Sequence, residues 1–327
     1  MAVYTNLNED QVKHFLKQYE IGDLISFSGI TEGIENTNFY LKTSNGNYIL
    51  TIFEKRVEVK DIPFFIKIML HLNKKGYYCP KPICDKKNNF LQYLNGKPTI
   101  IVNFLQGKSK KSFTSRDCYQ IGSSMGLMHY YSKDFEFERD NSLSIKGWKT
   151  LITNCNNTIP VSLLEKLQPN LMKELQNSFE LFLEFWPRDL PKGFIHADLF
   201  PDNVFFINDK ITGVIDFYFS CTDILTYDLA IAINAWCFDK KHNFLKKNYQ
   251  SLLSGYNSER KLSADENFFL PLLCQAAALR FLLTRLFDWV HTPIEAKVVP
   301  KNPEEYIIKH QYFKKLVNNV NYKENLL

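Results

Sequence analysis

The sequence of 327 residues predicts an α+β protein with two unequal lobes, a small β-rich lobe followed by a larger helical lobe. Two Asn-Gly pairs, at residues 45–46 and 95–96, lie between runs of strand-forming residues, and Asn-Gly favours the tight turns of antiparallel hairpins. After Asn103 the spacing of apolar residues becomes that of helices. The chain is also longer than one average domain, which agrees with a division into two parts.

The β-rich lobe is expected to span residues 1–103. Its expected elements, in order, are a helix at 8–19, strands at 24–30, 37–43 and 48–53, a helix at 62–75, and strands at 90–94 and 99–103. Asn8 and Gln11 have the spacing of a capping box at the start of the first helix. The second helix has Asp61 as its candidate N-cap and Pro63 in its first turn.

The helical lobe is expected to span residues 104–327. Its expected elements are helices at 114–131, 171–185, 223–238, 243–256, 264–290 and 303–317, and one hairpin with strands at 204–207 and 211–215. Gly122 and Gly126 fall on one face of the first of these helices, where another element could approach closely. The apolar segment 268–287 is interrupted by Pro271 and charged residues, so we interpret it as a buried helix and not as a membrane span.

Composition and charge exclude several classes of protein. Hydrophobic residues make up 45% of the chain and Gly and Pro number 13 each, which excludes a disordered or collagen-like protein. The net charge of +5 is small and the basic runs are short, so no nucleic-acid partner is expected. The seven cysteines form no Cys-x-x-Cys pair, which favours a reducing compartment over a disulfide framework. The first residues lack the apolar region of a secretory signal, so we expect a cytoplasmic protein, with monomer and homodimer both open.

The residues with the clearest chemical meaning surround the predicted hairpin at 204–215. Asp198 and Asn203 lie five residues apart on one loop, and Asp216 ends the second strand of the hairpin, which returns it to that loop. Buried carboxylates are costly unless they are paired, bind a cation or serve catalysis. Oxygen ligands from Asn and Asp suit Mg²⁺, which also binds substrate phosphates. We therefore predict a Mg²⁺ site at Asn203 and Asp216, with Asp198 left to accept a proton from a hydroxyl nucleophile or to orient it.

The spacing His-x-Asp-x-x-x-x-Asn, with a later Asp, is the arrangement of a kinase-type phosphotransferase. Within it, His196 is interpreted as a structural residue that packs and hydrogen-bonds the loop. Asp228, in Tyr-Asp-Leu-Ala, is interpreted as a structural anchor for the same loop.

Several segments, in order along nearly the whole chain, carry a family resemblance: GIENTNFY, YILTIFE, HADLFPDNVFF, GVIDFYFSCTDILTYDLAIAINAWC and QAAALRFLLTRLFDW. With them the chain resembles the aminoglycoside phosphotransferase and choline kinase superfamily, which has a protein-kinase-like fold, and within it the bacterial homoserine kinases. The resemblance implies transfer of the γ-phosphate of ATP to the side-chain hydroxyl of L-homoserine, a step in threonine biosynthesis. It also implies that Asp198 is the catalytic base and that Asn203 and Asp216 hold Mg²⁺.

The residues that grip the ATP phosphates depart from the wider kinase pattern. Thr51 stands where a lysine is expected on the third strand. Side chains alternate along a strand, so Lys55 points to the same face as Thr51 if the strand continues. Lys55 and Lys42 are the candidate replacements, and the alternative for each is a solvated surface lysine.

The loop expected to cover the phosphates lacks a Gly-x-Gly-x-x-Gly pattern. It has two isolated glycines, so backbone N–H groups together with Asn36 or Thr37 are the candidate phosphate contacts. The nucleotide base is expected to bind the backbone of the connector between the lobes, at Asn103 and Leu105.

The acceptor site requires groups for an ammonium and a carboxylate. The planar fork of an arginine matches a carboxylate, and Arg280 is the candidate. Its alternative role is an ion pair with Asp288 on the same helix face. Asp202 and Asp223 are candidates for the ammonium, and Tyr218 either lines the pocket or packs in the core.

Two other functions remain open. The chain could phosphorylate choline, an aminoglycoside or methylthioribose, of which choline requires an aromatic cage and a polycationic antibiotic an acidic cleft. The net charge of +5 disfavours the acidic cleft. A nucleotide-binding pseudokinase would be indicated by the loss of Asp198, Asn203 or Asp216, and all three are present.

Overall fold

The computed structural model describes residues 4–31, 36–54, 57–292, 300–320 and 322. The chain divides into two compact units, which are described one at a time. The first unit comprises Met1–Lys110, Asp134–Arg139 and Asp202–Phe219, and the second comprises Lys111–Lys133, Asp140–Pro201 and Ser220–Leu327. The lobe division between residues 103 and 104 stays a prediction.

An antiparallel sheet of six strands forms the centre of the first unit, in the order β1-β2-β3-β6-β4 with β5 also paired to β6. Its strands are β1 (Leu24–Ile30), β2 (Thr37–Thr43), β3 (Gly46–Ile52), β4 (Pro82–Ile83), β5 (Gln92–Leu94) and β6 (Lys97–Asn103). Both predicted hairpins are confirmed, and Asn95 and Gly96 both have the positive φ that a two-residue turn requires. Strand β4 was missed because two residues show no alternating pattern.

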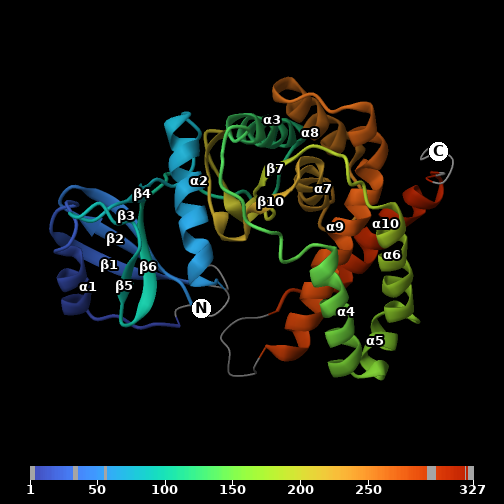
Figure 1. Ribbon diagram of the computed structural model, residues 1–327, viewed down its shortest axis with the longest axis horizontal. Helices are drawn as coiled ribbons and strands as arrows, with labels where there is room; N and C mark the ends of the chain where they lie inside the picture. Colours follow the sequence, from blue (N-terminus) through green and yellow to red (C-terminus); the bar gives the residue numbers. More distant parts are fainter. Residues whose placement is uncertain (1–3, 32–35, 55–56, 293–299, 321, 323–327) are drawn as a thin grey trace. The chain divides into compact units, whose positions relative to one another are not determined.

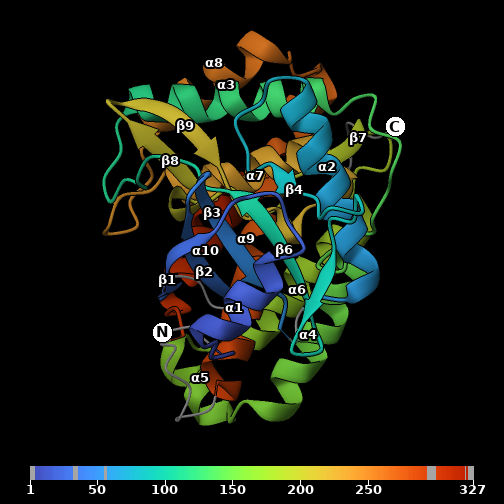
Figure 2. The same cartoon turned by 90° about the vertical axis from the view of Figure 1, so that its left-hand side faces the viewer.

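Helix α1 (Glu9–Leu16) covers one face of this sheet, and Figure 2 shows it in front of the strands. The predicted capping box of Asn8 and Gln11 is confirmed. Phe15 packs in a core that includes Leu41 of β2 and Leu50 of β3. The helix is therefore held by burial of its apolar face and by a satisfied N-terminus.

Helix α2 (Ile62–Lys74) follows a short 3₁₀ turn, η1 (Val59–Asp61). Asp61 is the N-cap residue of α2 and Pro63 lies in its first turn, as predicted, although the Asp61 side chain makes no capping hydrogen bond. Its carboxylate instead accepts a hydrogen bond from Nε of Arg139 at 2.7 Å. The first unit also contains the predicted hairpin, as β8 (Val204–Ile207) and β9 (Lys210–Val214), between the turns η2 (Pro201–Asn203) and η3 (Phe217–Phe219).

Helices dominate the second unit. They are α3 (Ser115–Tyr131), α4 (Ile145–Thr158), α5 (Val161–Leu167), α6 (Leu171–Phe185), α7 (Leu225–Trp236), α8 (Lys246–Glu259), α9 (Ala264–His291) and α10 (Glu304–Asn318). The six predicted helices are confirmed, whereas α4 and α5 were missed because α4 is rich in Asn and Thr and α5 is short. The antiparallel pair β7 (Lys192–Ile195) and β10 (Cys221–Ile224) was also missed, so Asp223 lies in a strand and not at the start of a helix.

Helices α3 and α8 approach each other closely at the predicted glycines. A Cβ atom at Gly122 would lie 1.9 Å from the carbonyl oxygen of Leu252, and one at Gly126 would lie 2.8 Å from that of Tyr256. Gly255 plays the same part from α8, since its Cβ would lie 1.9 Å from the oxygen of Tyr119. The predicted close approach is confirmed.

Helix α9 forms the core of the second unit and lies alongside α4 and α10 (Figure 1). It is long and apolar enough to cross a membrane, but 78% of its most apolar window is buried inside the protein. Its apolar face is therefore already covered by neighbouring helices, which confirms the prediction of a buried helix.

Candidate active site

The loop after β7 carries Asp198 in the second unit. The backbone N–H groups of His196 and Ala197 donate hydrogen bonds to the carboxylate of Asp228, at 2.9 and 2.8 Å. The N–H of Asp198 points back to Nδ1 of His196 at 3.3 Å. The two residues before Asp198 are thus attached to α7 through one carboxylate.

Asp228 belongs to a buried chain of hydrogen bonds. Nε2 of His129 lies 3.1 Å from its Oδ2, and Nδ1 of His129 lies 2.8 Å from the hydroxyl of Tyr256. The carboxylate can only accept, so Nε2 of His129 donates to it. Arg260 donates in turn to the hydroxyl of Tyr256 at 3.0 Å. Burial raises the pKa of Asp228, but the hydrogen bond and charge of His129 together with His196 outweigh it, so the pKa lies below its ordinary value.

Arg280, on α9, reaches the same loop from another helix. Its Nη1 donates to the carbonyl oxygen of Ala197 at 2.9 Å, and its guanidinium lies 3.9 Å from the centre of the Phe281 ring. Arg280 is only 3% exposed. Arg285, also on α9, pairs with Glu305 on α10 at 2.6 Å.

Asp223 and Tyr227 lie at the junction of β10 and α7. The carboxylate of Asp223 accepts a hydrogen bond from Nδ2 of Asn141 at 2.6 Å, and burial raises its pKa. The Tyr227 hydroxyl is buried and has no hydrogen-bond partner among the described residues. A buried hydroxyl without a partner is uncommon, so a polar ligand could satisfy it.

In the first unit the β8–β9 hairpin brings Asn203 and Asp216 together. Val204 pairs with Val214, and the N–H of Ile215 donates to the carbonyl oxygen of Asn203 at 2.9 Å. Asp216, the next residue, has a left-handed φ of 64°. The described residues contain no group of three or more His, Cys, Asp or Glu side chains placed to hold a metal. An amide and a carboxylate fit Mg²⁺, because Mg²⁺ keeps waters and phosphate oxygens as its other ligands.

Thr51, at the expected lysine position, is buried and bonded within the first unit. Its hydroxyl donates to Oδ1 of Asn38 at 2.7 Å, and it also hydrogen-bonds the side chain of Tyr218. The Tyr218 ring packs against Phe53 and Phe65, with ring centres 5.0 and 5.8 Å apart. Burial raises the pKa of Tyr218. Tyr218, two residues after Asp216, is thereby attached to the third strand of the sheet.

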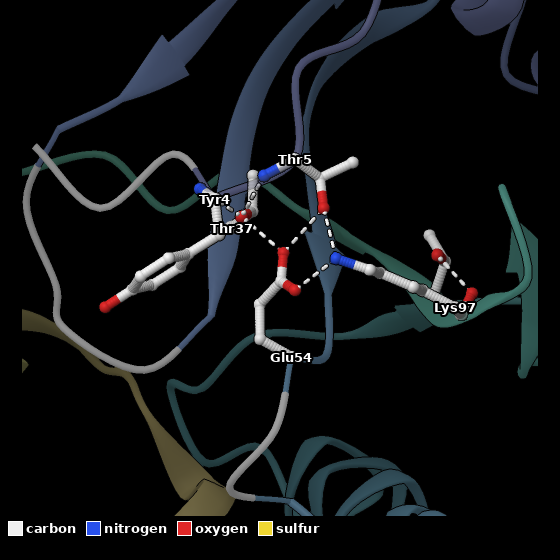
Figure 3. Close-up of polar contacts among 6 residues, drawn as sticks. Tyr4, Thr5, Thr37, Glu54 and Lys97 are labelled. Carbon is white, nitrogen blue, oxygen red and sulfur yellow. Dashed lines mark hydrogen bonds and ion pairs between the residues drawn. The ribbon is translucent and has the colours of Figure 1, made fainter. Parts of the chain in front are cut away.

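A cluster of side chains joins the ends of β2 and β3 to the N-terminal segment (Figure 3). The Thr37 hydroxyl accepts from the N–H groups of Tyr4 and Thr5 at 3.0 and 3.2 Å, and donates to Glu54 at 2.7 Å. Lys97 bridges the other oxygen of Glu54 and the hydroxyl of Thr5. A hydroxyl has one donor and two acceptor positions, so that of Thr37 is fully engaged inside this unit. No sequence pattern indicated this cluster.

The other predicted phosphate contacts are placed differently. Lys55 lies outside the described residues. Lys42 is exposed on β2. Asn36 is 7% exposed, and its buried Oδ1 has no hydrogen-bond partner among the described residues. That oxygen can only accept, as phosphate oxygens do, so a phosphate contact by Asn36 would have to use its backbone N–H or its Nδ2 donors.

The connector begins at the end of β6. Oδ1 of Asn103 accepts a hydrogen bond from the N–H of Lys81 at 2.6 Å, and the Asn103 N–H donates to the Lys81 carbonyl at 3.0 Å. Leu105 is half-buried and lies against Gly213, where a Cβ atom would be 2.6 Å from the leucine Cδ1. The Leu105 side chain therefore packs directly over the backbone of the hairpin at Gly213.

Comparison with known proteins agrees with this geometry. The profile of the phosphotransferase enzyme family matches residues 26–262. A homoserine kinase of Sinorhizobium medicae is 44% identical over 322 residues, covering 98% of this chain and 97% of the relative. A homoserine kinase of Rhodopseudomonas palustris is 46% identical over 314 residues, covering 95% and 94%. Amicoumacin kinase, solved in complex with AMP-PNP and Ca²⁺, has a similar fold with a TM-score of 0.69 at 15% identity, covering 97% of this chain and 95% of its own. The predicted fold class is confirmed.

Proposed function

We propose that this chain, which belongs to the phosphotransferase enzyme family, transfers the γ-phosphoryl group of ATP to the side-chain hydroxyl of L-homoserine. The observation that carries the proposal is 44% identity to a homoserine kinase over 98% of the chain. The products are O-phosphohomoserine and ADP, and the reaction is a step of threonine biosynthesis.

Asp198 is the proposed catalytic base. As the acceptor oxygen forms its bond to the γ-phosphorus, the bond from that phosphorus to the bridging oxygen of ADP breaks, and Asp198 takes the hydroxyl proton. His196 and Asp228 support the loop that holds it, through the hydrogen bonds of the His196 and Ala197 N–H groups. Positioning of this kind is a large part of phosphoryl-transfer catalysis.

Asn203 and Asp216 are the proposed Mg²⁺ ligands. The hydrogen bond between Ile215 and Asn203 supports a shared site, since it joins the residue before Asp216 to Asn203. Bound there, Mg²⁺ neutralises the charge of the ATP phosphates.

ATP is the proposed phosphoryl donor. Asn36, Lys42 and Lys55 are proposed phosphate contacts, Asn36 through its N–H donors and the lysines through their ammonium groups. Thr37 contributes through its backbone, because its hydroxyl is engaged by Glu54 and the N-terminal segment. The connector backbone at Asn103 and Leu105 is the proposed contact for the base.

The acceptor ammonium is proposed to bind Asp223 or Asp202. The candidate for its carboxylate from the sequence is Arg280, whose Nη1 already donates to the carbonyl oxygen of Ala197. Asp223 is supported by the nearby Tyr227, whose hydroxyl has no partner among the described residues. Tyr218 is proposed to shape the pocket from its position on Phe53.

We also propose that the enzyme is cytoplasmic, and no observation favours a choline, aminoglycoside or methylthioribose kinase.

The purified protein with ATP and Mg²⁺ is expected to form ADP only when homoserine is added, in a coupled ADP assay. Choline, kanamycin and methylthioribose serve as parallel acceptors, and omission of Mg²⁺ with a chelator tests the metal. Turnover with one of those acceptors and none with homoserine would overturn the substrate, and no turnover with any acceptor would indicate a pseudokinase.

A further inference from the structure

Ala197, the residue before Asp198, has an unusual backbone conformation. Its φ is 62°, in the left-handed region that glycine adopts readily and alanine does not, because the Cβ atom approaches the following carbonyl oxygen. Such a conformation persists only where the surroundings impose it, and such residues concentrate at functional sites.

Both polar groups of Ala197 are held by charged side chains from different helices. Its N–H donates to Oδ1 of Asp228 on α7 at 2.8 Å, and its carbonyl accepts from Nη1 of Arg280 on α9 at 2.9 Å. Asp228 is 0% exposed and Arg280 3% exposed. Hydrogen bonds with a charged partner are about twice as strong as neutral ones, so the two together can impose the strained conformation.

The guanidinium itself is held in place by the packing of α9. The central carbon of the guanidinium lies 3.9 Å from the centre of the Phe281 ring. Helices α7 and α9 also contact each other, because Nδ2 of Asn234 on α7 donates to the carbonyl oxygen of Cys274 on α9 at 3.0 Å. The helices that carry Asp228 and Arg280 are therefore joined directly to each other.

We propose that Arg280 is a positioning residue that, with Asp228, holds the Ala197 peptide in its left-handed conformation and so orients Asp198. The inference rests on the proposed function of Asp198 as the catalytic base. It differs from the sequence-based role of Arg280 as a ligand of the acceptor carboxylate, because a ligand acts on KM and a positioning residue acts on kcat.

The test uses Arg280→Met, which keeps much of the volume and removes the donors, and Arg280→Lys, which keeps the charge. A small misplacement of a catalytic group costs about 10²-fold, so kcat is expected to fall by about that factor with little change in KM for homoserine. Arg285→Met is the matched control, because Arg285 is on the same helix, is 9% exposed and bonds Glu305 instead. It is expected to lower stability and keep kcat.

A second substitution tests the path through Ala197. Glycine removes the cost of the left-handed conformation, so Ala197→Gly added to Arg280→Met is expected to recover about tenfold in kcat. A ligand of the acceptor would show no such recovery.

Hydrogen–deuterium exchange gives a measurement that needs no turnover. In Arg280→Met, peptides covering residues 192–203 are expected to exchange faster than in the wild type, and in Arg285→Met they are not. If the wild type lacks homoserine turnover but the exchange result holds, the proposed function fails and the positioning role stands. The positioning role would be overturned if Arg280→Met raised KM and left kcat unchanged, if its exchange matched that of the wild type, or if Ala197→Gly restored no kcat. If Arg280→Met does not fold, Arg280→Lys is judged by the same criteria.

Discussion

Two carboxylates, one in each unit, tie backbone segments to residues of the proposed site, and they do so in different environments. Asp228 is 0% exposed and its partner His129 is 0% exposed. Glu54 is 9% exposed, but its partner Lys97 is 39% exposed. Asp228 holds the two residues before Asp198, whereas Glu54 holds Thr37 and the N-terminal segment.

The difference between them lies in what happens when the carboxylate is removed. The N–H groups that donate to Asp228 are buried away from water. Without the carboxylate, each would remain an unsatisfied buried donor and lower the free energy of unfolding by the full desolvation penalty. If Glu54 is removed, the ammonium of the exposed Lys97 can be solvated by water, and an ion pair at the surface contributes little to the free energy of unfolding. We therefore expect activity and stability to depend much more on Asp228 than on Glu54.

The largest expected effect is a loss of activity on substitution of Asp198, whose loop is held by Asp228. Asp198→Ala should lower kcat by about 10²–10⁴-fold, because proton transfer to a positioned base is lost. Circular dichroism melting should show no loss of fold. Asp209→Ala is the control. Asp209 lies in the turn between β8 and β9, is exposed and forms an ion pair with Lys110, so this variant should keep full activity. Retained activity in Asp198→Ala would contradict the mechanism.

The next effect is on stability. Asp228→Asn should lower the free energy of unfolding by about 3–5 kcal/mol, because it breaks a fully buried charged network. One of the new side-chain atoms would be an amide nitrogen facing a backbone N–H or His129. Urea unfolding measures the loss, with Asp209→Asn expected to change it by less than about 0.5 kcal/mol. A loss as small as that of the control would mean that the buried network is not critical.

The smallest effect is expected at Glu54. Glu54→Gln should cost about 1 kcal/mol at neutral pH, because a hydrogen-bonded surface-facing ion pair is replaced by neutral contacts. Burial raises the pKa of Glu54, but hydrogen bonds from Lys97, Thr5 and Thr37 hold it below its ordinary value of 4.5.

This shift fixes the direction of the pH dependence. Below pH 4.5 the unfolded chain binds the proton before the folded chain does, so the stability contributed by Glu54 is present above that pH and lost as the pH falls. The difference in unfolding free energy between wild type and Glu54→Gln should therefore shrink in acid. A difference that grows in acid would contradict the assigned hydrogen bonds.

Most of the fold could be predicted because its signals are local. The hairpin at Asn95-Gly96, the capping box at Asn8 and the glycine face of α3 each depend on residues a few positions apart, and each is confirmed. Helix α4 and the pair β7–β10 were not predicted. Their residues have weak local propensity, and they form because of burial and pairing with distant segments.

The same distinction applies to the candidate site. The spacing of Asp198, Asn203 and Asp216 indicated a phosphotransferase, and the hairpin that joins Asn203 to Asp216 is confirmed. Their roles stay predictions. Nothing in the sequence indicated that Thr37 would bond Glu54, because Thr37 begins β2 and Glu54 follows the end of β3, 17 positions away.

The order of residues along the chain was therefore sufficient to identify a phosphotransferase fold and to predict three polar residues for its site, because such predictions depend on residue type and short spacing. Only the tertiary structure showed that Ala197 is left-handed and held between Asp228 and Arg280, which lie 31 and 83 residues away. Contacts at such separations arise from the packing of α7 against α9. That packing depends on the whole core, which no single stretch of sequence reveals.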